Sequence, residues 1–365
     1  MNRFTFILAI LLSFCILAPF SSLVSQNSFS FRYCTISDEV PFHATETVDG
    51  LYIVSAKIGD YQSKDYSTIF IKLSENGDTV KTLVVSKSPD VCIASDLITS
   101  NDGNFFCPGM LINSLGTSLW LLKLSPNLDI LMDTVYSTGL NDFNNIYGFA
   151  SNEENLVVYG SARQNSNYSH TFIYEFSQAG DSIRFKFLSD NNGSEYATSM
   201  IDKNDSSGYY LTIFGKYQEN TNSWGQILAL DSAFDVIDIS PIPLYLDMLF
   251  NMESIGTSQF VLTGKTFFEG EKNNQQLLGI VKMDTSFVVN DSLLLGPFDT
   301  LNYPGYLHNL DYTDTNTIYY AGTCNQSNTG DFSSNKSFFL LGCLTSTLDK
   351  KWEKYIGGDM YYTLW

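Results

Sequence analysis

Ile71-Lys72-Leu73-Ser74-Glu75-Asn76-Gly77-Asp78 is a short apolar strand that runs into a polar turn, and this stretch decides the fold because it returns along the chain. Three near copies and two looser ones follow, at residues 122–129, 174–181, 228–235, 281–288 and 342–349. The apolar residue before each turn falls at positions 73, 124, 176, 230, 283 and 344, so the spacings are 51, 52, 54, 53 and 61 residues. This regularity indicates tandem repeats of about 53 residues.

A second repeated pattern lies upstream of each turn, where a short apolar strand ends in a small residue. It occurs at residues 52–55, 105–109, 157–160, 211–215, 261–264 and 319–322. The two patterns occur in the same order in all six units. Each unit therefore contains at least two strands in a fixed order.

The second unit can be divided into four strands, at residues 93–100, 104–109, 119–124 and 130–137. Asp102-Gly103, like Asp49-Gly50 in the first unit, supplies the positive φ that a tight hairpin requires. Ser, Asn and Asp dominate the later turn because their side chains bond the local backbone. Beyond the N-terminal segment no period of 3.6 residues is present, so we expect no helices.

Four-stranded units of this length predict an all-β fold, a β-propeller with a WD40-like or kelch-like architecture. We expect one domain over residues 27–365 with about six full repeats and a partial seventh. The predicted repeats cover residues 40–88, 89–140, 141–190, 191–242, 243–301 and 302–358, and residues 359–365 begin a further repeat. Either six repeats close a ring, with 359–365 pairing with 29–36, or a seven-bladed ring lacks most of its last blade.

The end of the chain resembles a known family. Trp352-Glu353-Lys354-Tyr355-Ile356-Gly357-Gly358-Asp359 is similar to the W-x-K-x-Y-G-G junction of secreted bacterial propeller-like repeat proteins. Thr47-Val48-Asp49-Gly50-Leu51-Tyr52-Ile53-Val54 resembles the hairpin that follows this junction in the family. The resemblance covers most of residues 40–365 and implies a scaffold exported as cargo of type IX secretion. No sorting domain of that system is present in the sequence.

Residues 1–26 are predicted to be a signal peptide. Arg3 precedes an apolar run over residues 4–20, and a small, polar stretch follows at 21–25. The run is short for a membrane anchor, the alternative interpretation. No second long apolar run exists, so we expect no membrane span after cleavage. The protein is predicted to be secreted or to sit on the outer cell surface, after export through the periplasm.

Charge and cysteine content limit the partners. The net charge of −19 disfavours binding to nucleic acid, because an acidic surface repels phosphate backbones. Six widely spaced cysteines, one of them in the predicted signal peptide, form no disulfide framework, and we expect the other five to be small buried side chains. We expect a monomer without a cofactor.

The sequence contains no catalytic constellation and no metal-binding motif that we could assign. Ligand sites of propellers lie where inner strands meet the mouth of the central channel. The candidate binding residues there are His43, Tyr196, Tyr245, Asp247 and His308. His43 and His308 come from the first and sixth repeats, which become neighbours if the ring closes.

These features favour a secreted or surface-associated scaffold that binds a protein or a carbohydrate, without catalytic activity. A glycan-cleaving propeller enzyme is the alternative, and a structural segment of a longer exported adhesin is the third. Carboxylates and aromatic rings clustered at one mouth of the channel would favour the enzyme.

Overall fold

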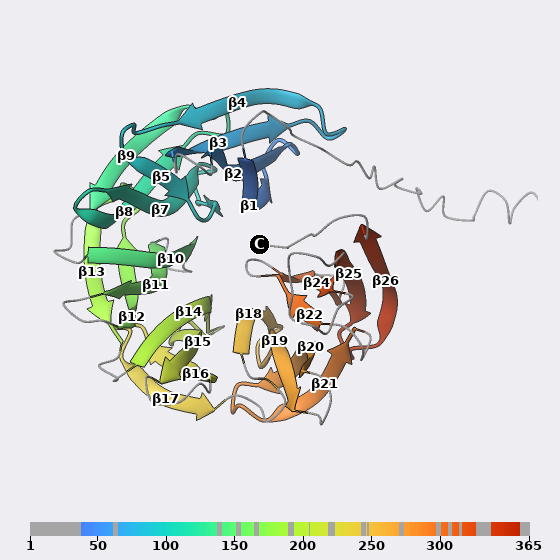
Figure 1. Ribbon diagram of the computed structural model, residues 1–365. Helices are drawn as coiled ribbons and strands as arrows, with labels where there is room; N and C mark the ends of the chain where they lie inside the picture. Colours follow the sequence, from blue (N-terminus) through green and yellow to red (C-terminus); the bar gives the residue numbers. More distant parts are fainter. Residues whose placement is uncertain are drawn as a thin grey trace, which may run out of the picture.

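The computed structural model describes most of the chain between residues 38 and 357. The described residues are 38–60, 65–136, 141–150, 155–163, 168–188, 193–203, 205–217, 223–241, 246, 248–269, 274–296, 301–305, 309–313, 316–325 and 337–357. They form six antiparallel blades arranged in a ring around a central axis (Figure 1). The all-β propeller with six four-stranded blades is therefore confirmed. The repeat length of about 53 residues stays a prediction, and residues 359–365, the expected start of a seventh repeat, lie outside the described residues.

Each blade is built from consecutive strands, with the first strand nearest the ring axis and the last at the rim (Figure 1). The first three blades contain β1 (Asp38–Glu46), β2 (Tyr52–Asp60), β3 (Asp65–Leu73) and β4 (Thr79–Val85); β5 (Val91–Ala94), β6 (Ile98–Thr99), β7 (Phe105–Asn113), β8 (Gly116–Leu124) and β9 (Ile130–Tyr136); and β10 (Asn141–Ala150), β11 (Leu156–Arg163), β12 (Ser169–Phe176) and β13 (Ser182–Phe187).

The last three blades contain β14 (Gly193–Asp202), β15 (Gly208–Tyr217), β16 (Ser223–Asp231) and β17 (Val236–Pro241); β18 (Met248–Ile255), β19 (Gln259–Glu269), β20 (Asn274–Asp284) and β21 (Val289–Leu295); and β22 (Leu301–Pro304), β23 (Leu310–Thr313), β24 (Thr317–Asn325), β25 (Ser337–Thr345) and β26 (Lys350–Gly357). In blades 2 and 6 the innermost strand is split in two. Blades 5 and 6 are also joined by a parallel bridge between Gln276 and Leu301.

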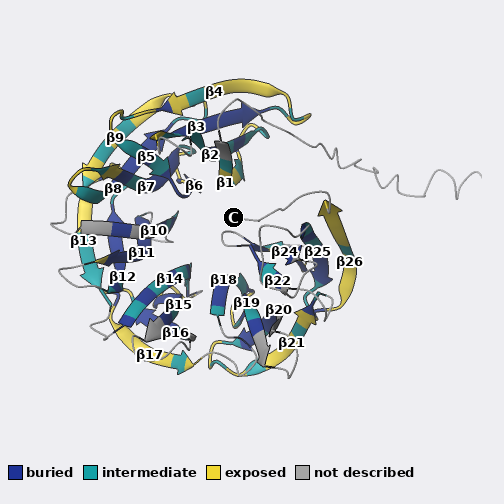
Figure 2. Cartoon of the chain, in the orientation of Figure 1, coloured by how far each residue is buried: buried dark blue, intermediate teal, exposed yellow. Residues whose placement is uncertain are grey.

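The hydrophobic core lies between blades. Blades 1 and 2 share one cluster that contains Phe70 and Trp120, and blades 2 and 3 share another with Phe143 and Phe172. Three further clusters fill the seams between blades 3 and 4, 4 and 5, and 5 and 6. Figure 2 shows the middle strands of the blades, such as β7, β8, β11 and β12, largely buried and the rim strands β4, β9, β17 and β26 mostly exposed. A single sheet cannot cover its own two faces, so neighbouring blades stabilise one another.

The turn between the third and fourth strands also plugs these seams. Its fourth residue adopts a positive φ in all six blades: Gly77, Leu128, Gly180, Phe234, Phe287 and Leu348. Three of the non-glycine residues, Leu128, Phe234 and Leu348, are buried in the core shared with the preceding blade. Burial of a large apolar side chain offsets the cost of the left-handed backbone, which is about 1 kcal/mol for a non-glycine residue.

The same turn accepts a hydrogen bond from a charged side chain of the preceding blade. Lys72 Nζ on β3 donates to the carbonyl oxygen of Pro126 in the turn of blade 2, at 2.9 Å. Lys123 does the same to Gln178, Arg184 to Ser232 and Lys282 to Ser346, at 2.9, 3.0 and 2.9 Å. In each case the acceptor is the second residue of the next blade's turn. We call this contact the turn clasp.

Local turn chemistry agrees with the prediction from sequence. Gly50 and Gly103 of the two Asp-Gly turns both have φ of 75°. Ser74 Oγ accepts a hydrogen bond from Asp78 N at 3.0 Å, as expected for a serine that caps a turn. Cys92, Cys107, Cys324 and Cys343 are buried free thiols, and Cys34 lies outside the described residues. Among the described residues no helix is long and apolar enough to cross a membrane.

Candidate functional site: a histidine-carboxylate cluster on the channel wall

An irregularity interrupts the innermost strand of every blade at the same height. The pairing register shifts between Pro41 and His43 in β1, and equivalent shifts occur in β10, β14 and β18. In blades 2 and 6 the interruption is larger and splits the strand into β5 and β6, and into β22 and β23. A bulge inserts an extra residue and re-aims side chains. His43, Ser199 and Asn251, at the bulges of β1, β14 and β18, contact a neighbouring blade.

The central contact joins blades 1 and 2. His43 Nδ1 lies 2.8 Å from Asp96 Oδ1, with the His43 side chain 15% exposed and the Asp96 side chain 1% exposed. Asp96 lies in the gap between β5 and β6, where the chain leaves the sheet. Its carboxylate also accepts hydrogen bonds from Leu97 N and from Gly148 N of blade 3, at 2.8 and 3.0 Å. These hydrogen bonds compensate for burying the carboxylate.

Two tyrosines of blade 3 lie within the field of this carboxylate. The rings of Tyr147 and Tyr159 are 5.7 Å apart at 44°. Burial, together with the charge of Asp96, raises the pKa of Tyr147 and that of Tyr159 well above their ordinary value. A hydrogen bond with the backbone of Met200 in blade 4 acts against this shift at Tyr159. Both phenols are therefore neutral hydrogen-bond donors at ordinary pH.

The polar belt continues through the remaining described blades. Ser199 Oγ of blade 4 donates to Asn251 Oδ1 of blade 5 at 2.9 Å. Asn251 Nδ2 donates to Leu310 O of blade 6 at 3.3 Å, and Thr263 Oγ1 donates to Asn309 Oδ1 at 2.5 Å. These contacts are made by neutral groups. The belt thus ties blades together, and the contact between blades 1 and 2 contains an ionisable pair.

Of the candidates predicted from sequence, His43 takes part in this cluster. Tyr196 lies on β14 in blade 4, half-buried, with its ring stacked on Phe214 at 5.2 Å and 26°. The two residues come from blades three apart in the ring, and no contact between them is found among the described residues. Tyr245, Asp247 and His308 lie outside the described residues, so the expected site shared by His43 and His308 stays a prediction.

Sequence reasoning missed Asp96, Tyr147 and Tyr159. Asp96 could have been found, because it is an acid inside the apolar stretch Val91-Cys92-Ile93-Ala94-Ser95-Asp96-Leu97-Ile98. A charged residue in such a stretch must find a partner when it is buried. The tyrosines gave no comparable signal, since aromatic residues are frequent throughout the strands of this protein.

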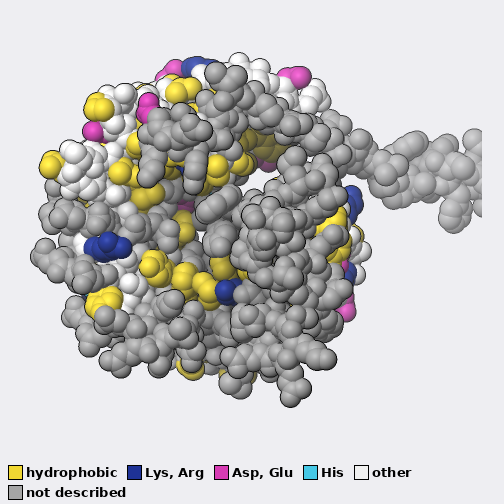
Figure 3. Space-filling view, viewed as in Figure 1, with side chains coloured by type: hydrophobic (Ala, Val, Ile, Leu, Met, Phe, Trp, Pro, Cys, Tyr) yellow, Lys and Arg dark blue, Asp and Glu magenta, His cyan; other side chains and the backbone are white. Residues whose placement is uncertain are grey.

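Within the described part of the chain, no group of three or more His, Cys, Asp or Glu side chains could hold a metal ion. Figure 3 shows hydrophobic side chains along the left inner rim of the ring, on the face turned to the viewer.

Comparisons with known proteins agree with the architecture. No family model and no curated protein matches the chain. Two solved structures of an ulvan lyase, described as a new polysaccharide lyase family named PL25, superpose with TM-scores of 0.51 and 0.50 at 9% identity. In both, the match covers 87% of this chain and 81% of the other. A β-fructofuranosidase from Bombyx mori superposes with a TM-score of 0.44 at 10% identity, over 88% and 87% of the two chains. At such identity the likeness is one of fold alone.

Proposed function

We propose that this protein binds a carbohydrate at the wall of its central channel. The observation that carries the proposal is the His43-Asp96 pair beside Tyr147, on the innermost strands of three consecutive blades. An imidazole, a carboxylate and phenols supply the donors and acceptors that hydroxyl-rich ligands need, and aromatic rings supply faces for sugar C–H groups. The rigid belt of blade-to-blade hydrogen bonds holds these groups in place before a ligand arrives.

The carboxylate has a specific effect on the imidazole. The carboxylate of Asp96, 2.8 Å from Nδ1, favours the tautomer that carries its proton on Nδ1, and this tautomer presents Nε2 as an acceptor. The ligand hydroxyl that meets His43 therefore donates, while the ligand oxygen that meets Tyr147 accepts. This opposite polarity over neighbouring positions suits adjacent hydroxyl groups on one sugar ring.

Glycan cleavage is the second candidate function, and the same pair favours it. A histidine oriented by a buried carboxylate is a competent general base, and the protonated phenol of Tyr147 can donate a hydrogen bond to a leaving oxygen. Polysaccharide lyases are among the proteins that share this fold, and one of them was solved with a bound glucuronic acid-rhamnose sulfate saccharide. Fold likeness alone carries no substrate over, so cleavage is separated from binding by experiment.

The test uses purified protein, a panel of neutral and acidic polysaccharides, and the variants His43→Ala and Tyr147→Phe. We expect saturable binding of at least one glycan and a loss of binding by about tenfold or more in His43→Ala. His170→Ala is the matched control, because His170 lies on β12 against Phe187. Unchanged binding in His43→Ala contradicts the proposal. New reducing ends, or the ultraviolet absorbance of unsaturated sugars, that appear with wild type and vanish in His43→Gln identify the protein as an enzyme.

We also propose that the chain is exported and acts outside the cell, as the signal-like residues 1–26 and the resemblance to secreted repeat proteins suggest. N-terminal sequencing of protein recovered from the periplasm or medium tests this. A mature chain that begins near residue 27 is the expected result. A chain that keeps Met1 and stays with the cell interior contradicts it.

A further inference from the structure

The turn clasps of blades 1 and 2 share one geometry that can be used as an internal template. In blades 1 and 2, a lysine two residues before the turn holds two partners at once. Lys72 pairs with Asp49 at 3.1 Å and with Pro126 O, and Lys123 pairs with Asp102 at 2.8 Å and with Gln178 O. Both carboxylates are the third residue of the turn between the first two strands of the blade. The ammonium group therefore bridges a carboxylate of its own blade and a carbonyl of the next blade.

The seam between blades 4 and 5 keeps both partners and lacks the cation. Ala229 stands two residues before the turn, where Lys72 and Lys123 stand in blades 1 and 2. Asp205 is the third residue of its turn, as Asp49 and Asp102 are, and it accepts a hydrogen bond from Ser207 N at 2.9 Å. Thr285 is the second residue of the next turn, at the position of Pro126. Among the described residues, this seam between consecutive blades has no turn clasp.

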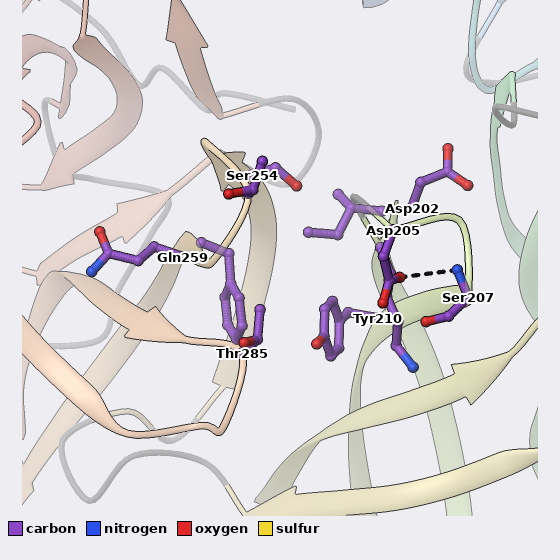
Figure 4. Close-up of a pocket in the computed structure, with 11 residues that line it drawn as sticks. Asp202, Asp205, Ser207, Tyr210, Ser254, Gln259 and Thr285 are labelled. Atoms are coloured by element: carbon purple, nitrogen blue, oxygen red, sulfur yellow. Dashed lines mark hydrogen bonds between the residues drawn. The ribbon is translucent and has the colours of Figure 1, made fainter.

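A cavity of about 310 Å³ lies at this seam, and both Asp205 and Thr285 line it. Figure 4 shows Asp205 and Tyr210 of blade 4 on one side of it and Ser254 and Thr285 of blade 5 on the other. Its lining is mostly polar. A gap that arose only from a shortened apolar side chain would be lined by apolar groups and would stay dry.

The side chains that line the cavity carry a net negative charge, which favours a cation. Asp202 and Asp205 contribute two carboxylates, and Lys203 contributes one ammonium group. Lys203 does not replace the clasp, because its Nζ donates to Leu230 O of its own blade at 2.9 Å and lies over the Tyr210 ring at 5.2 Å. Hydrogen bonds from Ser207 lower the pKa of Asp205, so this carboxylate is charged at neutral pH.

We propose that this cavity is a binding site for the primary ammonium or guanidinium group of a ligand, which would bridge Asp205 and the carbonyl of Thr285. The ligand group takes the place that Lys72 and Lys123 fill in the other blades. The site lies between the blades, away from the His43 cluster, and is independent of the function proposed for the channel wall. The cation comes either from a small amine or from a lysine or arginine side chain of a partner protein.

The full mature protein is titrated with N-acetyl-lysine methylamide, with the same compound acetylated on Nε, and with an acetylated Gly-Lys-Gly peptide amide, followed by calorimetry or NMR. We expect saturable binding of the charged ligands and none of the neutral one. Tight binding of the peptide alone points to a protein side chain, and equal binding of the single amino acid points to a small amine. Equal binding of the neutral and charged compounds overturns the proposal.

Asp205→Asn is expected to weaken binding by about tenfold or more, the effect of losing a charge-assisted hydrogen bond. Asp78→Asn, an exposed acid in the turn of blade 1, changes the net charge equally and is expected to leave binding unchanged. A parallel loss in both variants would mean that only the overall charge attracts the ligand, which contradicts a built site.

Ala229→Lys supplies the missing cation within the chain. We expect it to raise Tm by a few degrees and to abolish binding of the charged ligands, because the lysine then bridges Asp205 and Thr285. Ala229→Met adds similar bulk without charge and is expected to give no gain in Tm. Equal gains in Tm for lysine and methionine contradict the proposal, as does a lysine variant that folds and still binds the ligand as wild type does.

Discussion

The carboxylate of Asp96 accepts a hydrogen bond from Gly148 N at 3.0 Å while it lies 2.8 Å from Nδ1 of His43. One buried side chain of blade 2 thus contacts the innermost strands of blades 1 and 3. The same residue that orients the proposed ligand-binding histidine also stabilises the ring, so function and stability are coupled at this point.

Asp96→Ala is expected to destabilise the protein by about 3–5 kcal/mol, since it leaves buried partners without their acceptor. The free energy of unfolding, measured in urea, checks this. Asp238→Ala, an exposed acid on β17, should change stability by about 0.5 kcal/mol or less. Similar midpoints for wild type and Asp96→Ala would show that the contact is not structural.

Lys123→Met tests the turn clasp between blades 2 and 3. The methionine keeps the length of the side chain but loses the contacts with Asp102 and Gln178 O, and the expected cost is about 1–3 kcal/mol. Lys350→Met breaks an exposed pair with Glu353 and should cost about 0.5 kcal/mol or less. Equal effects in the two variants would argue against any special role of the clasp. Denaturant unfolding of both variants supplies the comparison.

The clasps also predict sensitivity to acid. Hydrogen bonds from Thr47 and Lys72 lower the pKa of Asp49. At Asp102, partial burial raises the pKa. Hydrogen bonds from Lys123, Ser100 and Asn104 outweigh this effect and hold the pKa of Asp102 well below its ordinary value. A carboxyl with a lowered folded-state pKa contributes stability that is present above the unfolded value of about 4 and is lost as pH falls below it. Tm should therefore drop steeply below about pH 4. Asp102→Asn should flatten that drop, and an unchanged slope would count against the assignment.

Phe234 tests the plugging of seams by turn residues. Phe234→Ala removes a fully buried ring from the core between blades 3 and 4 and should cost about 3–5 kcal/mol. Val236→Ala, an exposed change two residues later, is the control and should cost little. Thermal and urea unfolding of both variants would reveal the difference. A small effect of Phe234→Ala would contradict the role of this ring in the packing of the seam.

The repeat could be predicted from sequence because its signals are local. Ser74 and Asp78 bond each other's backbone within one turn, and Gly50 needs its positive φ whatever surrounds it. The lysine of the stretch that begins at Ile71 was visible in the first two copies, but its role was not. Its partner Pro126 lies 54 residues away, in the next copy.

The candidate site could be predicted only in part for the same reason. His43 was chosen because it begins an inner strand, yet its partner Asp96 belongs to another blade, and the bulge that turns it there leaves no pattern in the sequence. In the sequence, the cavity between blades 4 and 5 corresponds to a missing lysine. Ala229 stands where Lys72, Lys123 and Lys282 stand in blades 1, 2 and 5, and this becomes informative only when the structure shows what those lysines hold.

Each buried turn residue packs into the core that its blade shares with the preceding blade of the chain. Phe234 of blade 4 covers the core of blade 3, and Leu128 of blade 2 covers that of blade 1. During synthesis on the ribosome, the interior of each blade therefore stays uncovered until the following repeat has emerged almost to its end. The nascent chain carries one unsealed apolar face at every stage, and this moving face is where chaperones would be needed.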